Sequence, residues 1–324
     1  MKLLNLPFLV KELVFEMMNK GERLDLALTS KRMKRTIQAT RLKCDYDVTI
    51  DFQVQTIVIS GVREYIAALG SYLHRGPRTR MTSFNGEETV LVEMNGSSFQ
   101  CYWETDEQLH EGFFKIIVYL LSKLDINFIS NLNLMVERSA LRTLHFLNNK
   151  EILFGNVFFI GNGPENIYFG DIIFSYNFLR RVNSRFTTFA ALPVFVIPTF
   201  PNSASLNVQS VHIDDSRWLN ISHLLSFEKA RDIELHQSSL EDKDLQEFLK
   251  SWSNGNFQEL KRFEISTDHI LSIKEITMDL VDQKRISISA EREKAEIYGR
   301  ANLRGVVRIY FRDKYTFIFE TRTN

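Results

Sequence analysis

The feature that most constrains this chain is a change of hydrophobic period near Cys44. Before this point the apolar residues recur at helical spacing. From Val48 and Ile50 onward they alternate with polar residues. A period of i, i+3, i+4 predicts amphipathic helices, and alternation predicts strands with one buried face. We therefore expect a small helical domain at residues 1–43 and a larger strand-containing region at residues 44–324.

The helical domain begins with a short amphipathic pattern. Four apolar residues share one helical face because they are spaced i, i+3, i+4 and i+7. They are Val10, Leu13, Val14 and Met17. Pro7 stands where the first turn of a helix tolerates a missing N–H. Ser30 precedes the basic residues 31–35 as the N-cap of a further helix.

The clearest unit of the larger region spans Val211 to Ser266 and contains strand, helix, strand, helix and strand. Its strands are marked by Ile213, Ile233 and Phe263. They recur about every twenty to thirty residues, which is in the range of leucine-rich repeats. No asparagine-ladder consensus accompanies them. The predicted fold class is α+β, with a small helical domain and then an irregular leucine-rich-repeat-like α/β domain.

Other elements follow from the same patterns. Residues His110 to Leu124 show a broad apolar face typical of a helix. Three short apolar runs predict strands, and they are Phe128–Val136, Asn156–Ile160 and Asp171–Phe174. The stretch Arg75–Glu88 predicts an exposed loop or hairpin tip. The chain is expected to end in strands at Arg285–Ile288, Ala295–Tyr298, Val306–Phe311 and Thr316–Glu320.

Charge and composition narrow the classes of partner. Lys+Arg and Asp+Glu each number 40, so no net field attracts the chain to nucleic acid or to an anionic membrane. No apolar run reaches the roughly 18 residues of a membrane span, and Pro7 interrupts the start too early for a secretory signal. We expect an intracellular protein of the cytoplasm or nucleus. Its two cysteines, Cys44 and Cys101, exclude a disulfide scaffold.

Catalytic motifs are absent from the sequence. It contains no nucleophile elbow, no phosphate loop, no HExxH and no kinase signature set. We therefore expect a protein that is not an enzyme and that needs no cofactor. An alternative hydrolase would use His212 or His223 with neighbouring acids, but no nucleophile completes such a site.

Several polar residues cluster in the α/β unit. The candidate metal ligands are His212, His223 and His236 with Asp214, Asp215 and Asp232. Their spacing matches no metal-ligand pattern, so solvated or capping roles are favoured and no metal is expected. Ser239 is the expected N-cap of the second helix. Trp218 and Trp252 are interpreted as core anchors because apolar neighbours surround them at helical spacing.

Two segments resemble known modules. Residues Leu4 to Gln38 resemble an F-box through the opening Leu6-Pro7, the apolar positions that follow and the closing Ser30-Lys31-Arg32. The motif WLNISHLL followed by IELHQSSLEDKDLQEFLKSWSNGNFQELKRFEI, at about residues 208–276, is similar to the second type of F-box associated domain. That domain is abundant in nematodes, and the order of the two modules is the expected one.

The resemblance implies a substrate-recognition subunit of a Skp-cullin-F-box ubiquitin ligase. Its F-box would dock on a Skp-type adaptor, and through it on a cullin, while the rest of the chain binds a protein substrate. The expected adaptor-binding residues are Leu6, Pro7, Leu9, Val10, Leu13 and Val14, with Ser30 and Lys31 at the edge. The alternative is a protein-interaction scaffold that uses the repeat-like domain without any ligase.

Overall fold

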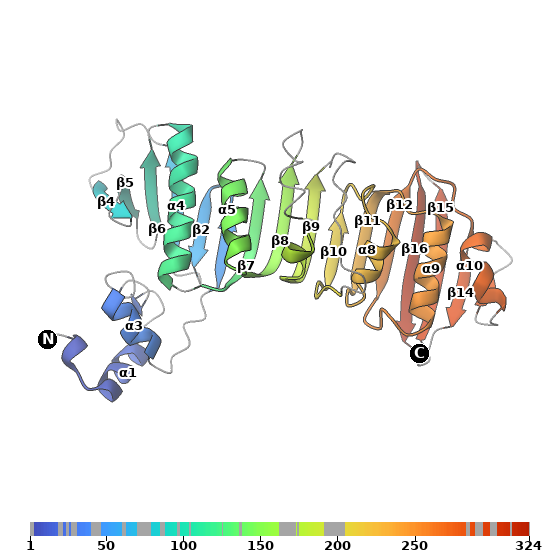
Figure 1. Cartoon of the computed structure of the whole chain (residues 1–324), viewed down its shortest axis with the longest axis horizontal. Helices are drawn as coiled ribbons and strands as arrows, with labels where there is room; N and C mark the ends of the chain where they lie inside the picture. Colours follow the sequence, from blue (N-terminus) through green and yellow to red (C-terminus); the bar gives the residue numbers. More distant parts are fainter. Residues whose placement is uncertain are drawn as a thin grey trace. The chain divides into compact units, whose positions relative to one another are not determined.

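The structure is a computed structural model of the 324-residue chain (Figure 1). The residues that it describes are 3–18, 22–23, 26, 31–39, 47–59, 63–69, 79–84, 88–95, 98–103, 105–124, 126–135, 138–161, 173, 175–190, 205–282, 286–288, 294–298, 303–311 and 313–323. The chain divides into two compact units, Met1–Leu153 and Phe154–Asn324.

The first unit begins with helices. These are the 3₁₀-helix η1 (Leu3–Asn5), α1 (Phe8–Met17) and α3 (Lys31–Ala39). Pro7 occupies the N-cap of α1 with a φ of −53°, so the helix starts where its missing N–H costs nothing. The amphipathic helix predicted near Pro7 is confirmed. The three-helix domain and its boundary after residue 43 stay predictions, because residues 27–30 and 40–46 lie outside the described residues.

The first unit also contains a mixed sheet. Its strands are β1 (Val48–Asp51), β2 (Thr56–Ile59), β3 (Arg63–Leu69), β4 (Thr79–Phe84), β5 (Glu88–Asn95), β6 (Ser98–Trp103) and β7 (Phe128–Met135). They are hydrogen-bonded in the order β7, β1, β2, β3, β6, β5, β4. The pairs β1–β7 and β3–β6 are parallel, and the other pairs are antiparallel.

Two long helices pack in this unit. They are α4 (Asp106–Leu124) and α5 (Arg138–Asn149), which contact each other and lie on one side of the strands in Figure 1. The α4 residues Phe113, Ile117 and Leu120 are buried, and the Phe113 ring packs edge-on against Phe52 at 5.3 Å between centroids. The apolar face predicted for this helix is therefore its packing face.

The second unit is built on a larger sheet. Its strands are β8 (Leu153–Gly161), β9 (Val182–Ala190), β10 (Ser210–Ile213), β11 (Asp232–Ser238), β12 (Arg262–Thr267), β13 (Ile286–Ile288), β14 (Lys294–Tyr298), β15 (Leu303–Phe311) and β16 (Tyr315–Thr323). Their order is β8, β9, β10, β11, β12, β16, β15, β14, β13. Strands β8 to β12 are parallel, and the strands from β16 to β13 pair antiparallel.

Helices lie between strands of this unit. Three of them are in the parallel part, α7 (Tyr176–Leu179), α8 (Ile221–Ser226) and α9 (Asp242–Ser253), and α10 (Ile273–Asp282) follows β12 and leads to the antiparallel strands. In Figure 1, α8, α9 and α10 lie on one side of the sheet. Alternation along each strand sends apolar residues toward this side and polar residues to the other. The pattern is visible in β12, where Phe263 and Ile265 are buried and their neighbours are not.

An aromatic cluster forms the core beneath α9. The ring of Phe248 contacts those of Phe257, Phe263 and Phe319, with centroids 4.5 to 5.6 Å apart. Trp252, one turn further along α9, packs edge-on against Phe319. Such edge-to-face aromatic contacts add to the apolar area that they bury. This cluster fixes α9 against β12 and β16.

Most of the predicted elements are confirmed. The helix around His110–Leu124 and the strands that end the chain are present, and β10, β11 and β12 alternate with helices as expected. Helices and strands together make the chain α+β. The leucine-rich-repeat character of the second unit stays a prediction. No helix among the described residues is long and apolar enough to cross a bilayer.

Two predictions are wrong in part. Residues Thr79–Phe84, expected within an exposed loop or hairpin tip, form strand β4 and pair antiparallel with β5, because hydrogen bonding to a neighbouring strand outweighs their polar composition. The hairpin alternative agrees with this pairing, whereas the loop alternative does not. The strand expected at Asp171–Phe174 falls mostly outside the described residues, and Ile173, the part that is described, is helical.

Candidate functional site

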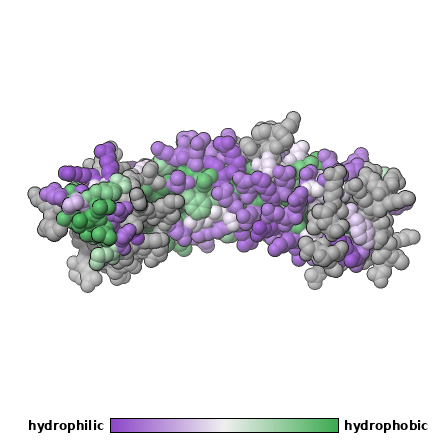
Figure 2. Space-filling view, turned by 90° about the horizontal axis from the view of Figure 1, so that it is seen from below, coloured by the Kyte–Doolittle hydropathy of each residue, from purple (hydrophilic) through white to green (hydrophobic). Residues whose placement is uncertain are grey.

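The most exposed apolar surface of the first unit lies on α1. Leu9 is 71% exposed, Leu13 59% and Met17 88%, and Phe8 and Val10 are exposed as well. Soluble domains rarely leave several large apolar side chains together in water without a use for them. Figure 2 shows a hydrophobic patch, in green, at the end of the view where α1 lies. We call these five residues the α1 apolar patch.

One residue of α1 is buried. Phe15 is fully buried, whereas Val14 is only half-buried. Phe15 lies outside the i, i+3, i+4, i+7 stripe, so the stripe that the sequence reveals is not the buried face of the helix. Among the described residues of α1, the buried face is therefore narrow and most of the apolar stripe is exposed.

The predicted adaptor-binding residues fall into three groups. Leu9, Val10 and Leu13 belong to the exposed patch. Three others are beside it, and they are the half-buried Leu6 and Val14 and the exposed Pro7. Ser30 lies outside the described residues. Lys31 opens α3, and the structure describes its backbone but not its side chain.

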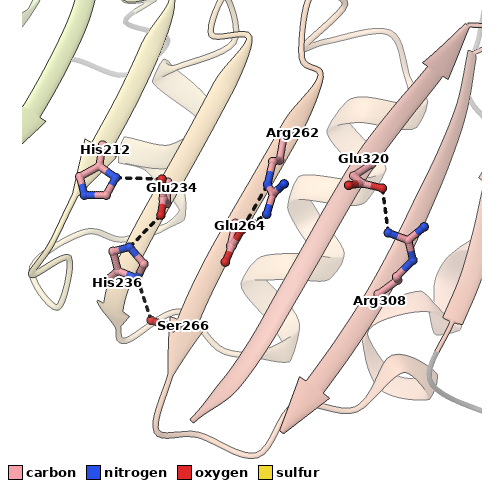
Figure 3. A network of polar contacts seen from close by, with 8 residues as sticks. All are labelled: His212, Glu234, His236, Arg262, Glu264, Ser266, Arg308 and Glu320. Carbon is pink, nitrogen blue, oxygen red and sulfur yellow. Dashed lines mark hydrogen bonds and ion pairs between the residues drawn. The ribbon is translucent and has the colours of Figure 1, made fainter. Parts of the chain in front are cut away.

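The second unit presents a polar network on its open sheet face, opposite the helices (Figure 3). His212 on β10 and Glu234 on β11 are register partners in neighbouring parallel strands. His236 follows Glu234 by two positions and so lies on the same face. Ser266 on β12 completes the row. The register of three parallel strands thus places these four side chains side by side.

Glu234 is at the centre of this network. Its two carboxylate oxygens contact His212 Nδ1 at 2.9 Å and His236 Nε2 at 3.0 Å. The other ring nitrogen of His236, Nδ1, lies 3.2 Å from Ser266 Oγ. The two imidazole rings meet edge-on with centroids 5.3 Å apart. Burial raises the pKa of Glu234, but the contacts and charges of His212 and His236 outweigh it and lower this pKa overall.

Two ion pairs extend the polar surface across the sheet (Figure 3). Arg262 donates to Glu264 two positions further along β12, with its Nη2 at 2.5 Å from Oε2. Arg308 on β15 donates to Glu320 on β16 at 2.8 Å. The first pair raises the pKa of Arg262 chiefly through its hydrogen bond to Glu264. The open face is therefore charged and hydrogen-bonded across five strands.

The sequence identified only part of this network. It singled out His212 and His236 but grouped them with His223, Asp214, Asp215 and Asp232, and it missed Glu234. Asp232 is exposed at the start of β11. Glu234 and His236 are two residues apart on β11, so their side chains lie on the same face of the strand. The parallel register then places Glu234 beside His212 on β10. Strand register depends on tertiary packing, so residue spacing alone does not give it.

Two of the other candidates, His223 and Asp215, have structural roles. His223 caps α8: Asn220 Oδ1 accepts from its backbone N–H, and its Nδ1 accepts from the Asn220 N–H. Asp215 is buried and accepts two hydrogen bonds from the Arg217 side chain. The capping role predicted for one of these histidines is confirmed. The hydrolase alternative gains nothing from the positions of His223 and Asp215.

One capping prediction is wrong. Glu241, not Ser239, is the N-cap of α9, and Asp244 accepts from the Glu241 N–H at 2.9 Å. Ser239 donates instead to the Arg217 carbonyl. The two residues between Ser239 and the first helical residue place its hydroxyl too early to cap the helix. The tryptophan prediction is confirmed, since Trp218 and Trp252 are both buried.

Comparison with known proteins gives one match. Residues 199–265 match the family model described as F-box associated. No curated protein and no solved structure matches the chain. The matched residues include β10, α8, β11, α9 and most of β12. The network formed by His212, Glu234 and His236 therefore lies in a segment similar to an F-box associated domain.

Proposed function

We propose that this chain is the substrate-recognition subunit of a Skp-cullin-F-box ubiquitin ligase of nematode type and performs no bond chemistry itself. The α1 apolar patch docks on a Skp-type adaptor, and the second unit binds the target protein. The observation that carries the proposal is the exposed patch on a helix that precedes a segment similar to an F-box associated domain. F-box proteins with such segments typically act as substrate adaptors of these ligases.

The energetics favour docking by α1. Full burial of one large aliphatic or aromatic side chain is worth about 1.5–3 kcal/mol. The α1 apolar patch offers five such side chains on one short helix, and the partner groove need only accept an amphipathic helix. The loss of translational, rotational and side-chain freedom on association offsets part of this free energy. The patch offers more exposed apolar side chain than any other described helix of the first unit, so we expect it to be the main contact with an adaptor.

Substrate binding is assigned to the open sheet face of the second unit. This face carries both charges and hydrogen-bonding groups, among them His212, Glu234 and Arg262. A polar face suits a partner that must be released after modification, because such interfaces are selective without being permanent. By holding the target near a ubiquitin-charged enzyme, the subunit raises its effective concentration. We propose that the protein acts in the cytoplasm or nucleus.

The experiment is a quantitative pull-down of the purified full chain with a Skp-type adaptor. The test variant is Leu9→Arg with Leu13→Arg, because both side chains are exposed and their replacement leaves the fold intact. The control is Val54→Arg, since Val54 has the same exposed fraction as Leu13, 59%, but lies in the turn between β1 and β2.

The proposal predicts adaptor binding by wild type and by the Val54 control, and loss of most binding by the α1 double variant. Equal binding by all three proteins would move the docking surface away from α1. Absence of binding by a well-folded wild type would reject the ligase role and favour a protein-interaction scaffold.

A further inference from the structure

The His212–Glu234–His236 cluster has the donor set of a metal site. Two imidazoles and one carboxylate are common ligands of zinc and related ions. One nitrogen of each histidine and one oxygen of Glu234 all lie within 4.8 Å of one another. From this geometry we propose that the three residues bind a divalent transition-metal ion of the zinc class. The inference is independent of adaptor docking, which concerns α1.

The distances require little rearrangement. Ligand atoms about 2.1 Å from a tetrahedral zinc ion are about 3.4 Å from one another. Glu234 contacts His212 Nδ1 through Oε2 at 2.9 Å and His236 Nε2 through Oε1 at 3.0 Å, and both distances are within about half an ångström of this value. Because the ligand atoms of the three residues all lie within 4.8 Å of one another, no pair has to approach by more than about 1.4 Å to reach it. The backbone needs no change, because all three residues lie on paired strands.

An outer hydrogen bond orients one of the ligands. His236 presents Nε2 to Glu234, while its Nδ1 lies 3.2 Å from Ser266 Oγ. Ligating histidines almost always use their second ring nitrogen in this way, and the contact fixes both the ring orientation and the tautomer. Ser266 is therefore a positioning residue, and Figure 3 shows it at the end of the row.

The charges around the site permit a cation to bind. Glu264 on β12 is the register partner of Glu234, so a second carboxylate lies beside the cluster. Among the cations on neighbouring strands, the guanidinium of Arg262 is held by Glu264, and that of Arg185 on β9 donates to Thr187. The three ligand side chains are 18%, 46% and 31% exposed for His212, Glu234 and His236, so an ion reaches them from solvent.

Three protein ligands leave the site open. A zinc ion normally takes four ligands, and a site with three protein ligands keeps the fourth position for water or an incoming group. Because the cluster lies on the open sheet face, that fourth position points to the surface assigned to the target protein. A side chain of the target with a carboxylate or imidazole would be able to fill it.

The competing explanation is a surface hydrogen-bond cluster that binds no metal. In that case the nitrogens that face Glu234 carry protons, and the same contacts serve only to order the polar face. The two explanations differ in one observable. A metal displaces those protons and binds with defined stoichiometry, whereas a hydrogen-bond cluster has no specific affinity for Zn²⁺.

The test is a titration of the full chain, free of any polyhistidine tag, with Zn²⁺ alone against a chromophoric chelator. Co²⁺ in its place reports tetrahedral coordination through its visible absorption. We expect one ion per chain in wild type and at least about 10-fold weaker binding in His212→Gln and in His236→Gln. This is the loss that outer-shell changes alone commonly cause.

Matched variants separate the site from general effects. Glu234→Gln keeps the shape of the side chain and removes its charge, so it should also weaken binding while leaving the fold unchanged. Ser266→Ala should weaken binding less than either histidine variant. His145→Gln, an exposed histidine of α5, should bind Zn²⁺ as wild type does.

Thermal melting completes the test, because an ion that binds only the folded chain raises its melting temperature. The increase should appear in wild type and in His145→Gln but not in His212→Gln. Two results would overturn the proposal. One is a wild type without stoichiometric Zn²⁺ binding. The other is equal binding by wild type and by the variants of the three ligands.

Discussion

Helices α1 and α9 carry apolar residues at the same spacing but in opposite environments, exposed in α1 and buried in α9. In α1 the stripe is Val10, Leu13, Val14 and Met17, and in α9 it is Leu245, Phe248, Leu249 and Trp252. All four residues of the α9 stripe are buried, whereas three of the four in α1 are exposed and the fourth is half-buried. Spacing therefore identifies a face of a helix but does not say what covers it.

The difference has a structural cause. The α9 stripe packs on the aromatic residues Phe263 and Phe319 of the sheet beneath it. The buried residue of α1 is Phe15, which lies on another side of the helix. The α9 stripe therefore stabilises the fold. The α1 stripe is available for a partner, and changes in the two stripes should separate stability from binding.

The largest effect is expected from truncation at the second position of each stripe. Phe248→Ala should lower the free energy of unfolding by about 3–5 kcal/mol, because it removes a buried ring from a close-packed cluster. Leu13→Ala, at the matching position of α1, should change it by less than about 0.5 kcal/mol. Urea unfolding measures the free energy of unfolding of both variants. Similar losses in the two would contradict the assignment of the α9 stripe to the core and of the α1 stripe to the surface.

A smaller loss is expected from overpacking the same cluster. A Cβ atom added at Gly305 would overlap the Phe319 ring and press on Trp252. Gly305→Ala should therefore cost about 1–3 kcal/mol, which is typical of an extra methyl group in a packed core. Thermal or urea unfolding tests this. An unchanged stability would mean that the Phe319 and Trp252 rings can move to make room for the added methyl group, and that the packing beneath α9 is looser than its burial indicates.

The smallest effect concerns how the two helices begin. Asp244, the third residue of α9, accepts the N–H of the N-cap residue Glu241 and so closes a capping box, whereas α1 starts at Pro7 with no side-chain cap. Asp244→Ala should lower stability by about 0.5–2 kcal/mol. Lys243→Ala, an exposed neighbour on the first turn, is the control and should be nearly neutral. Equal effects of the two changes would show that the cap is not what stabilises this end of α9.

Much of the fold could be predicted from the sequence because the hydrophobic periodicity is clearest in the longest helices and strands. The α4 helix and the strands that end the chain follow directly from it. Weaker local patterns were less decisive, as at Thr79–Phe84, where a loop and a hairpin were both expected and pairing with β5 decides the structure. Ser239 is the residue type that commonly caps a helix, but it lies two positions before Glu241, which is the N-cap.

The α1 residues could be predicted from the sequence, whereas the cluster around Glu234 could be predicted only in part. The adaptor-binding residues came from a motif that is local in sequence, so Leu9, Val10 and Leu13 were named in advance. Their exposure was not, because it depends on which face of the helix is buried. The cluster around Glu234 joins three strands, and its members meet only through the parallel register. No local pattern contains that information.

If the apolar stripe of α1 is a docking surface and that of α9 is core, an adaptor should protect one helix and leave the other unchanged. Amide hydrogen exchange of the full chain with and without a Skp-type adaptor measures this difference. We expect residues 8–17 to become strongly protected when the adaptor binds, while residues 242–253, already protected in the free chain, do not change. Binding that leaves exchange at residues 8–17 unaltered would contradict this assignment, as would rapid exchange of α9 in the free chain.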